Sequence, residues 1–326
     1  MTDLQFGVFV PQGWKMELAS IEDPTDKWAK AVEVAVLAEE LGFDSLWVYD
    51  HFHNVPRPAH ETMFDCWMTM AAVSQRTSQI KLGQMVGCAL YREPTLLAKL
   101  TSNLDVMSGG RLIWGIGAGW YEHEYKAYGF GPELPAPVDR LRMLRETVEI
   151  VTAMWSESDV TYQGRHYTVA GAQCDPKPVQ QPRPPVLIGG GGEQITLRIV
   201  AEFGDAANFG GKPHEFEHKC EVLRKHCDDV GRDYDTVQKT WSPEVFIRSD
   251  DQEIVDGGTR SFVGEPYESW RAGNLVGTPE QVAEKIQTYI GLGCTGFYPW
   301  CSDYPDTETM RLLAEEVIPQ VRSANA

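Results

Sequence analysis

A run of four glycines is the clearest chemical signal in this sequence. Gly189-Gly190-Gly191-Gly192 begins at the last residue of the apolar segment Pro185–Gly189. Glycine has no Cβ atom, so its backbone N–H groups can lie directly against a phosphate, most favourably where a helix begins. A tight turn alone would need fewer glycines, so the run predicts a phosphate-binding site.

A histidine directly after an acidic residue is the second candidate. Asp50 and His51 stand at the end of the apolar segment Asp44–Asp50. Histidine has an ordinary pKa of about 6.5, which suits proton transfer near neutral pH. His51 is therefore the candidate catalytic acid or base. The competing interpretation is a histidine that only forms hydrogen bonds within a loop.

Several other residues could line a site without doing chemistry. Trp120 and Trp300 follow or end apolar segments and could pack against a flat ring, whereas most of the ten tryptophans are expected in the core. A catalytic thiol needs a neighbouring base, which the sequence alone does not show, so Cys88 and Cys301 are interpreted as lining residues. Gly115–Gly119 carries glycine at every second position, which does not match a dinucleotide-binding spacing and also fits close packing.

The elements that must position these residues alternate between short β-rich segments and amphipathic helices. Eight such units in succession predict a parallel sheet closed into a (β/α)8 TIM barrel, formed by one domain over residues 1–326. A doubly wound open sheet is the competing fold, but no phosphate loop follows the first strand. The expected strands are Leu4–Pro11, Asp44–Asp50, Ile80–Val86, Arg111–Gly119, Pro185–Gly189, Ala206–Phe209, Gln238–Ile247 and Gly296–Cys301.

Two segments interrupt the alternation and are expected as insertions after strands 4 and 7. A short hairpin is predicted over Val160–Val169, and the polar, glycine-rich stretch Arg248–Gly277 is predicted as a loop. The sequence Thr278-Pro279-Glu280-Gln281 is a capping box that starts the seventh helix. In a TIM barrel the carboxyl ends of the strands carry the active site, which is where Asp50, His51 and the glycine run fall.

A metal site is a further possibility at these strand ends. His51 and His53 resemble the histidine pair of metal-dependent amidohydrolase barrels, and Asp303 follows the last strand. That site needs further histidines after strands five and six, where this chain has glycines. We therefore expect no metal.

Composition excludes several classes of protein. The chain has 326 residues with 29 basic and 47 acidic side chains, a net charge of −18 that disfavours nucleic-acid binding. No apolar run approaches the roughly 20 residues of a membrane helix, and no signal peptide is recognisable. The seven cysteines are never spaced as Cys-x-x-Cys, which favours reduced thiols and a cytoplasmic location.

Several segments together resemble one family. The chain is similar over nearly its whole length to the luciferase-like flavin and deazaflavin oxidoreductases, most of all to the branch that uses coenzyme F420. The segments that carry the resemblance are Gly42–His51, Tyr91–Pro94, Leu104–Arg111, Gly115–Glu122, Pro185–Gly190 and Gly277–Glu280.

The resemblance implies a deazaflavin lying across the mouth of the barrel. Its ring would rest against a bulge in strand three with a non-prolyl cis peptide, for which Gln84-Met85 is the matching dipeptide, and the glycine run would hold its phosphate. One sugar-oxidising branch carries Glu and Asn where this chain has Trp120 and His123, so sugar oxidation is not expected. The cofactor contacts implied are Asp50, His51, Gln84, Met85, Gly87, Gly119, Trp120, His123, Gly189, Gly190, Gly191 and Gly192.

The predicted function is hydride transfer between F420 and a small organic substrate, with His51 moving the accompanying proton. The alternatives are an FMN-dependent monooxygenase, a metal-dependent hydrolase and a barrel that binds flavin without turnover. The substrate is expected among the loops Pro56–Met63, Gly129–Val138 and Arg248–Gly277. The resemblance also suggests a homodimer.

Overall fold

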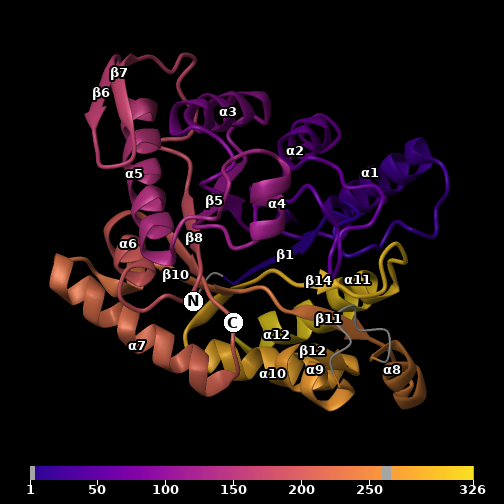
Figure 1. The fold of residues 1–326 in the computed structure, drawn as a ribbon. Helices are drawn as coiled ribbons and strands as arrows, with labels where there is room; N and C mark the ends of the chain where they lie inside the picture. The colour runs from indigo at the N-terminus through magenta and orange to yellow at the C-terminus, as the bar shows by residue number, and fades with distance from the viewer. Residues whose placement is uncertain (1–3, 259–265, 326) are drawn as a thin grey trace.

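A closed barrel of parallel strands forms the centre of the protein, and helices surround it (Figure 1). The computed structural model describes residues 4–258 and 266–325, and within them eight strand positions run in the order β3–β2–β1–β13–β10–β9–β8–β5, where β5 pairs again with β3. The predicted TIM barrel is therefore confirmed. Its strands are β1 (Gln5–Phe9), β2 (Ser45–Val48), β3 (Lys81–Gln84), β5 (Leu112–Gly117), β8 (Val186–Gly189), β9 (Ala206–Asn208), β10 (Gln238–Trp241) and β13 (Cys294–Phe297).

Side-chain caps determine where some of the helices that cover the barrel begin. Asp23 accepts hydrogen bonds from the backbone N–H groups that start α1, and the predicted capping box of Thr278 and Gln281 starts α10. The main helices are α1 (Pro24–Glu40), α2 (Cys66–Ser74), α3 (Pro94–Met107), α5 (Pro137–Ser156), α6 (Thr196–Phe203), α7 (Pro213–Val230) and α10 (Pro279–Gly291), followed by α11 (Glu308–Leu312), a π-helical turn (Leu313–Val317) and α12 (Ile318–Ala324).

The third barrel strand is interrupted by a bulge. Gln84 is still in register with Val48 of β2, after which the chain leaves the barrel and returns as β4 (Gly87–Cys88), which pairs with β5. The non-prolyl cis peptide joins Met85 to Val86. Its prediction at Gln84–Met85 was therefore wrong by one residue, because Gln84 still belongs to the regular strand.

The alternating glycines of β5 exist because this bulge lies against them. A Cβ atom on Gly115 would lie 1.8 Å from the Gln84 carbonyl oxygen, and one on Gly117 would lie 2.7 Å from Val86. Gly189 of β8 is equally restricted, since its Cβ would also lie 2.7 Å from Val86. The packing explanation for these glycines is therefore the one that the structure supports.

Strand seven and the segment after it differ from the prediction. Gln238–Ile247 is divided into β10, in the barrel, and β11 (Glu244–Ile247), in a separate sheet with β12 (Leu275–Gly277) and β14 (Trp300–Cys301). Pro243 lies at the break, where its missing N–H cannot continue the ladder. Arg248–Gly277 is not a loop, since it contains α8 (Asp251–Gly258), α9 (Tyr267–Gly273) and β12; its residues 259–265 lie outside the described part.

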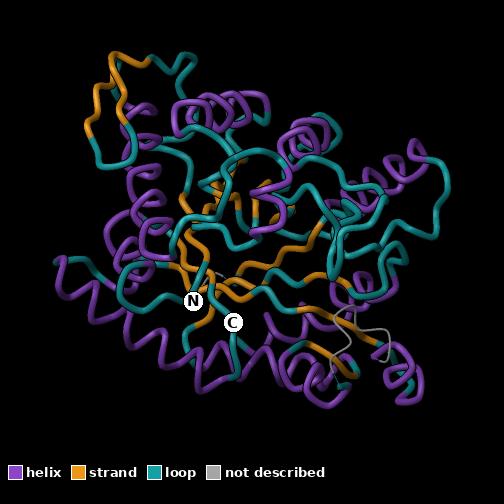
Figure 2. Tube along the Cα trace, in the orientation of Figure 1, coloured by secondary structure: helices purple, strands orange, loops and turns teal. Residues whose placement is uncertain are grey.

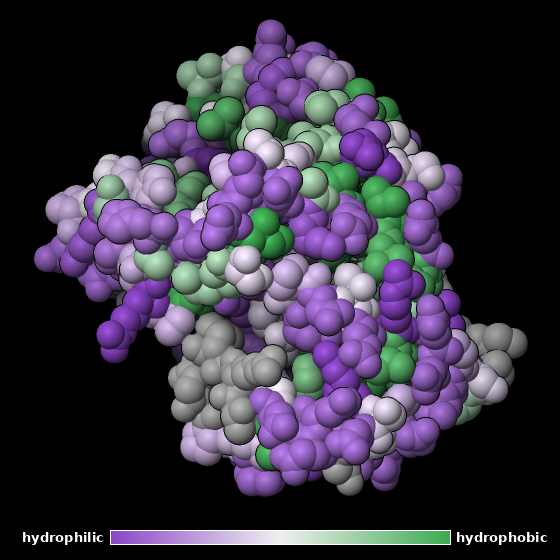
Figure 3. All heavy atoms as spheres, turned by 90° about the vertical axis from the view of Figure 1, so that its right-hand side faces the viewer, coloured by the Kyte–Doolittle hydropathy of each residue, from purple (hydrophilic) through white to green (hydrophobic). Residues whose placement is uncertain are grey.

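Two further elements follow the fourth barrel strand. The short helix α4 (Glu122–Ala127) comes directly after β5, and the hairpin β6 (Val160–Gln163) and β7 (Thr168–Ala172) projects beside α5, away from the barrel (Figure 2). Hydrophilic residues cover much of the face in Figure 3, where hydrophobic residues form a band on the right and smaller patches elsewhere. No helix among the described residues is long and apolar enough to cross a membrane.

Candidate active site

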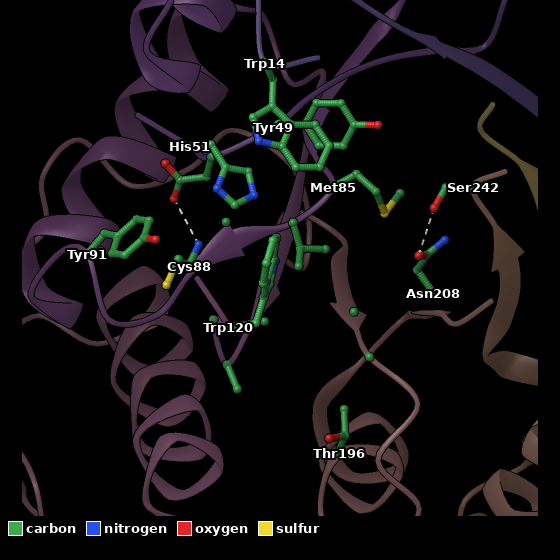
Figure 4. Close-up of a pocket in the computed structure, with 18 of the residues that line it drawn as sticks. Trp14, Tyr49, His51, Met85, Cys88, Tyr91, Trp120, Thr196, Asn208 and Ser242 are labelled. Carbon is green, nitrogen blue, oxygen red and sulfur yellow. Dashed lines mark hydrogen bonds between the residues drawn. The ribbon is translucent and has the colours of Figure 1, made fainter. Parts of the chain in front are cut away.

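A cavity of about 590 Å³ opens at the carboxyl ends of the barrel strands. Figure 4 shows His51, Trp14 and Tyr49 on one side of it and Asn208 and Ser242 on the other, with Met85 between them. Its lining residues are Trp14, Lys15, Tyr49, Asp50, His51, Met85, Val86, Gly87, Cys88, Tyr91, Gly117, Ala118, Gly119, Trp120, Gly189, Gly190, Thr196, Asn208, Ser242, Glu244 and Asn274.

His51 is held by a buried carboxylate. Its Nδ1 lies 2.8 Å from Oε2 of Glu124, a residue of α4 whose side chain is fully buried. The same oxygen accepts a 2.7 Å hydrogen bond from the Tyr91 hydroxyl, and Oε1 accepts from the backbone N–H groups of Phe52 and His53 at 2.8 Å each. Glu124 therefore receives four hydrogen bonds and fixes the orientation of the imidazole.

The charge of Glu124 follows from these contacts. Burial raises the pKa of this carboxyl group. The hydrogen bond and the charge of His51 lower it, as do the hydrogen bonds from the His53 backbone and the Tyr91 hydroxyl. Together these contacts outweigh burial, so the pKa of Glu124 is lowered. An ionised carboxylate only accepts hydrogen bonds, so Nδ1 of His51 carries the proton and Nε2 remains for exchange with a bound molecule.

Aromatic rings enclose His51. The ring of Trp14 is stacked on it at 4.6 Å with an interplanar angle of 2°, and Trp120 and Tyr121 approach it edge-on at 5.7 and 5.8 Å. Trp120 itself is 60% exposed at the cavity mouth. A large exposed aromatic side chain beside a cavity is typical of a ligand contact.

Asp50 holds the bulge in place. Its carboxylate accepts two hydrogen bonds from Nη1 of Arg92, at 2.9 and 2.7 Å, one from the backbone N–H of Cys88 at 2.9 Å, and one from the thiol of Cys66 at 3.1 Å. The ion pair is buried, with side-chain exposures of 2% for Asp50 and 10% for Arg92. Asp50 thus positions β4 within the cavity wall.

The glycine run forms the far end of the cavity. Gly189 and Gly190 line it together with Thr196, the first residue of α6. Gly190 has φ +119°, a conformation that L side chains rarely adopt, and its N–H donates to the carbonyl of Asn208 at 2.9 Å. Gly191 and Gly192 continue towards the helix but do not line the cavity.

A buried ion pair occupies another part of the lining. Nζ of Lys15 lies 2.7 Å from Oε1 of Glu244, and the two side chains are 6% and 11% exposed. Burial lowers the pKa of Lys15, and the charge and hydrogen bond of Glu244 oppose that shift. Glu17 stands beside the pair and accepts hydrogen bonds from the backbone N–H groups of Gln12, Gly13 and Lys15.

The cavity gathers eight of the twelve residues expected to contact a cofactor: Asp50, His51, Met85, Gly87, Gly119, Trp120, Gly189 and Gly190. Gln84, His123, Gly191 and Gly192 are not among its lining residues. Gln84 is fully buried one residue before the bulge.

Of the other residues and loops expected to line the site, some line the cavity and others do not. Cys88 lines the cavity, and burial raises the pKa of its thiol to about 12, which rules out a thiolate nucleophile near neutral pH. Trp300 and Cys301 are buried behind the wall. The loops Pro56–Met63 and Gly129–Val138 contribute nothing to the lining, and Arg248–Gly277 contributes Asn274 among its described residues.

Several residues that form or support the site were missed by sequence reasoning, among them Glu124, Trp14, Lys15 and Glu244. Glu124 lies 73 positions from His51, and Lys15 lies 229 positions from Glu244, so no local spacing links either pair. The position of Trp14 and Lys15 a few residues after the first strand was the available signal. Among the described residues, no cluster of three or more His, Cys, Asp or Glu side chains could hold a metal ion.

Comparisons with known proteins agree with this architecture. The model of the luciferase-like monooxygenase family matches residues 4–267. An F420-dependent glucose-6-phosphate dehydrogenase from Amycolatopsis mediterranei is 34% identical over 325 residues, covering 90% of this chain and 94% of the relative. This chain therefore belongs to the luciferase-like monooxygenase family.

Solved structures share the fold. An F420-dependent secondary alcohol dehydrogenase in complex with an F420–acetone adduct has a TM-score of 0.82 at 21% identity, with 98% of this chain and 99% of that chain covered. The monooxygenase RslO1 from Streptomyces bottropensis has a TM-score of 0.80 at 21% identity, with 97% and 99% covered. At this identity the likeness shows the barrel alone and does not choose between dehydrogenase and monooxygenase.

Proposed function

We propose that this protein is an F420-dependent oxidoreductase that transfers a hydride between the deazaflavin and a small organic substrate. The observation that carries the proposal is that His51, held by the buried Glu124, lines the same cavity as Gly189 and Gly190. The 34% identical relative named as F420-dependent supports the choice of cofactor.

The residues present fit such a cofactor. Met85, Val86 and Gly87 form a wall against which a flat ring can rest, and Trp120 offers an aromatic face at the mouth. Gly190 leaves room for a phosphate where α6 begins, since a Cβ there would meet only Thr196 at 3.5 Å. When bound, F420 supplies the hydride donor or acceptor at its C5 atom.

The protein's own residues supply proton transfer and orientation. Nε2 of His51 exchanges the proton that accompanies hydride transfer, while Glu124 stabilises the imidazolium that forms when His51 is protonated. Trp14 limits rotation of the imidazole by stacking on it. Asp50 and Arg92 hold the bulge against which the ring is oriented.

A fluorescence-quenching titration of the protein with F420, run in parallel with FMN, tests the proposal. Tight binding of F420 and weak binding of FMN is the expected result. The reverse preference, with oxygen consumed in the presence of reduced FMN, would support a monooxygenase. Binding of neither compound would refute the proposal.

A pair of glycine variants tests whether the glycine run binds the phosphate of the cofactor. Gly190→Ala forces an L side chain into φ +119° and should weaken F420 binding. Gly291→Ala is the matched control, because Gly291 ends α10 and a Cβ there meets nothing within 4 Å. Equal F420 affinity in both variants would exclude the glycine run as the phosphate site.

We also propose that the protein forms a homodimer. Met68 of α2 and Leu96 and Met107 of α3 are 72%, 50% and 51% exposed, and these two helices contact each other. Large exposed apolar side chains on adjacent helices are typical of an interface. Sedimentation equilibrium of the protein and of Met68→Lys tests this proposal; a monomer at micromolar concentration would refute it.

A further inference from the structure

We propose that Lys15 and Glu244 form a substrate-recognition subsite that selects an uncharged hydroxyl, carbonyl or amide group of the substrate. This inference rests on the proposed function, since it takes the same cavity to hold F420. It adds a substrate class: compounds that carry an uncharged polar group in addition to the group that reacts near His51.

The pair is built into the cavity wall. Glu244 receives a second hydrogen bond from Nε1 of Trp270, 2.7 Å from its Oε2, and its backbone N–H donates to the side chain of Asn274 at 2.8 Å. Nζ of Lys15 lies 4.3 Å from the ring centroid of Trp300. Both charged groups are therefore fixed in position and nearly excluded from water, as a recognition site requires.

The charge around Lys15 decides which group the subsite accepts. Glu244 neutralises the ammonium group, and the Glu17 carboxyl group lies near enough to act on it as well. A carboxylate or phosphate would bring another negative charge beside these acids in a poorly solvated wall, at considerable cost. An uncharged group can exchange hydrogen bonds with the pair without adding charge.

The two polar parts of the cavity are close enough for a small molecule to contact both. Trp14 is stacked on His51 at 4.6 Å, and Nζ of Lys15 lies 5.7 Å from the Trp14 ring centroid. Because Trp14 contacts both groups, a substrate lying along its ring would reach His51 with one polar group and the Lys15–Glu244 pair with another.

Matched neutral and anionic substrates test the inference. We would measure kcat and KM for F420-linked turnover of acetone against pyruvate. The wild type should favour the neutral member in kcat/KM by about tenfold or more, the effect of one charge-assisted contact. Glu244→Gln removes the carboxylate that is ion-paired with Lys15, so the ratio should shift towards the anion by about tenfold.

A second set of variants separates recognition from folding. Lys15→Met should raise KM for the neutral compound by about tenfold while kcat changes by less than about threefold. Lys30→Met, which removes the exposed ion pair with Glu33 on α1, is the control and should change neither. Circular dichroism and thermal melts establish which variants fold.

A titration that requires neither turnover nor F420 completes the test. Acetamide and acetate have nearly the same shape, and Trp14 and Trp300 lie beside the pair and can report binding by fluorescence. Acetamide should quench the wild type more strongly than acetate, with the preference reversed in Glu244→Gln. An acetate preference in the wild type, or unchanged preferences in Glu244→Gln, would overturn the inference.

The two proposals fail in different ways. If F420 does not bind but acetamide is preferred, the cofactor assignment is wrong and the recognition subsite stands. If F420 binds and the wild type turns over the anionic members in preference, or no neutral compound at all, the substrate class is wrong and the cofactor assignment stands.

Discussion

Replacing Glu124 with Gln should inactivate His51 without unfolding the site. The two backbone N–H groups of Phe52 and His53 can only donate, so the amide oxygen of Gln must face them. Its NH₂ group then faces Nδ1 of His51 and the hydroxyl of Tyr91. The Tyr91 hydroxyl can rotate so that its oxygen accepts a hydrogen bond from this NH₂ group. The imidazole of His51 can accept one only if its proton moves from Nδ1 to Nε2. Nε2, which faces the cavity, can then no longer act as a base.

The size of the effect follows from the lost proton transfer. General acid–base catalysis by a positioned side chain is worth about 10²- to 10⁴-fold in rate, and the switched tautomer removes that contribution. The lost charge-assisted hydrogen bond alone, about 1.5–3 kcal/mol, corresponds to roughly 10- to 150-fold. We therefore expect kcat to fall by about 10²-fold or more, while the Kd for F420 changes by less than about threefold.

Two measurements check this expectation. Stopped-flow absorbance of F420 gives kcat, and ¹⁵N NMR of the histidines reports which ring nitrogen of His51 carries the proton. Tyr91→Phe is the matched control, because it removes a neutral donor to the same oxygen and should cost only about fivefold. A proton on Nε2 in the wild type, or equal losses of kcat and F420 affinity in Glu124→Gln, would refute the reasoning.

Three further outcomes are expected. Arg92→Met leaves the Asp50 carboxylate buried without its cation and should lower the free energy of unfolding by about 3–5 kcal/mol, measured by urea titration. Gly189→Ala places a Cβ 2.7 Å from Val86 and should cost about 1–3 kcal/mol, whereas Gly291→Ala should be neutral or slightly stabilising. Because the pKa of Glu124 is lowered from its ordinary 4.5, its carboxylate stabilises the fold above pH 4.5, and that contribution is lost as the pH falls through the lower folded-state value. The difference in unfolding free energy between wild type and Glu124→Gln should thus shrink as the pH falls below 4.5; a difference that persists unchanged in acid would contradict this.

The barrel could be predicted because its signals are local. Apolar segments, helix caps and terminal glycines recur in order, and each depends on neighbouring residues only. One error lies at a break that the sequence itself carries. Gln238–Ile247 contains Ser242-Pro243 at its middle, and its second half pairs with β12 and β14, much further along the chain.

The site residues that could be predicted from the sequence are those at the carboxyl ends of the barrel strands. Asp50, His51, Gly189 and Gly190 come together because parallel strands place their carboxyl ends at one edge. Glu124 could not be assigned from the sequence, since it lies in a short helix that crosses back over the barrel to reach His51. An acidic residue in such a position is ordinarily a solvated helix residue.

The role of Asp50 shows how the packing of the barrel determines the chemistry of its mouth. Glycines at positions 115, 117 and 189 let the bulge enter the space between β5 and β8, and Asp50 fixes it there through the N–H of Cys88. The Asp50 carboxylate is already engaged by Arg92, so it has little capacity left to bind a cofactor directly. The residue after it, His51, is directed to the cavity because Asp50 is anchored to the wall. In the proposed mechanism the adjacent acid and histidine therefore have different roles: Asp50 would hold the surface on which the ring rests, and His51 would exchange the proton beside it.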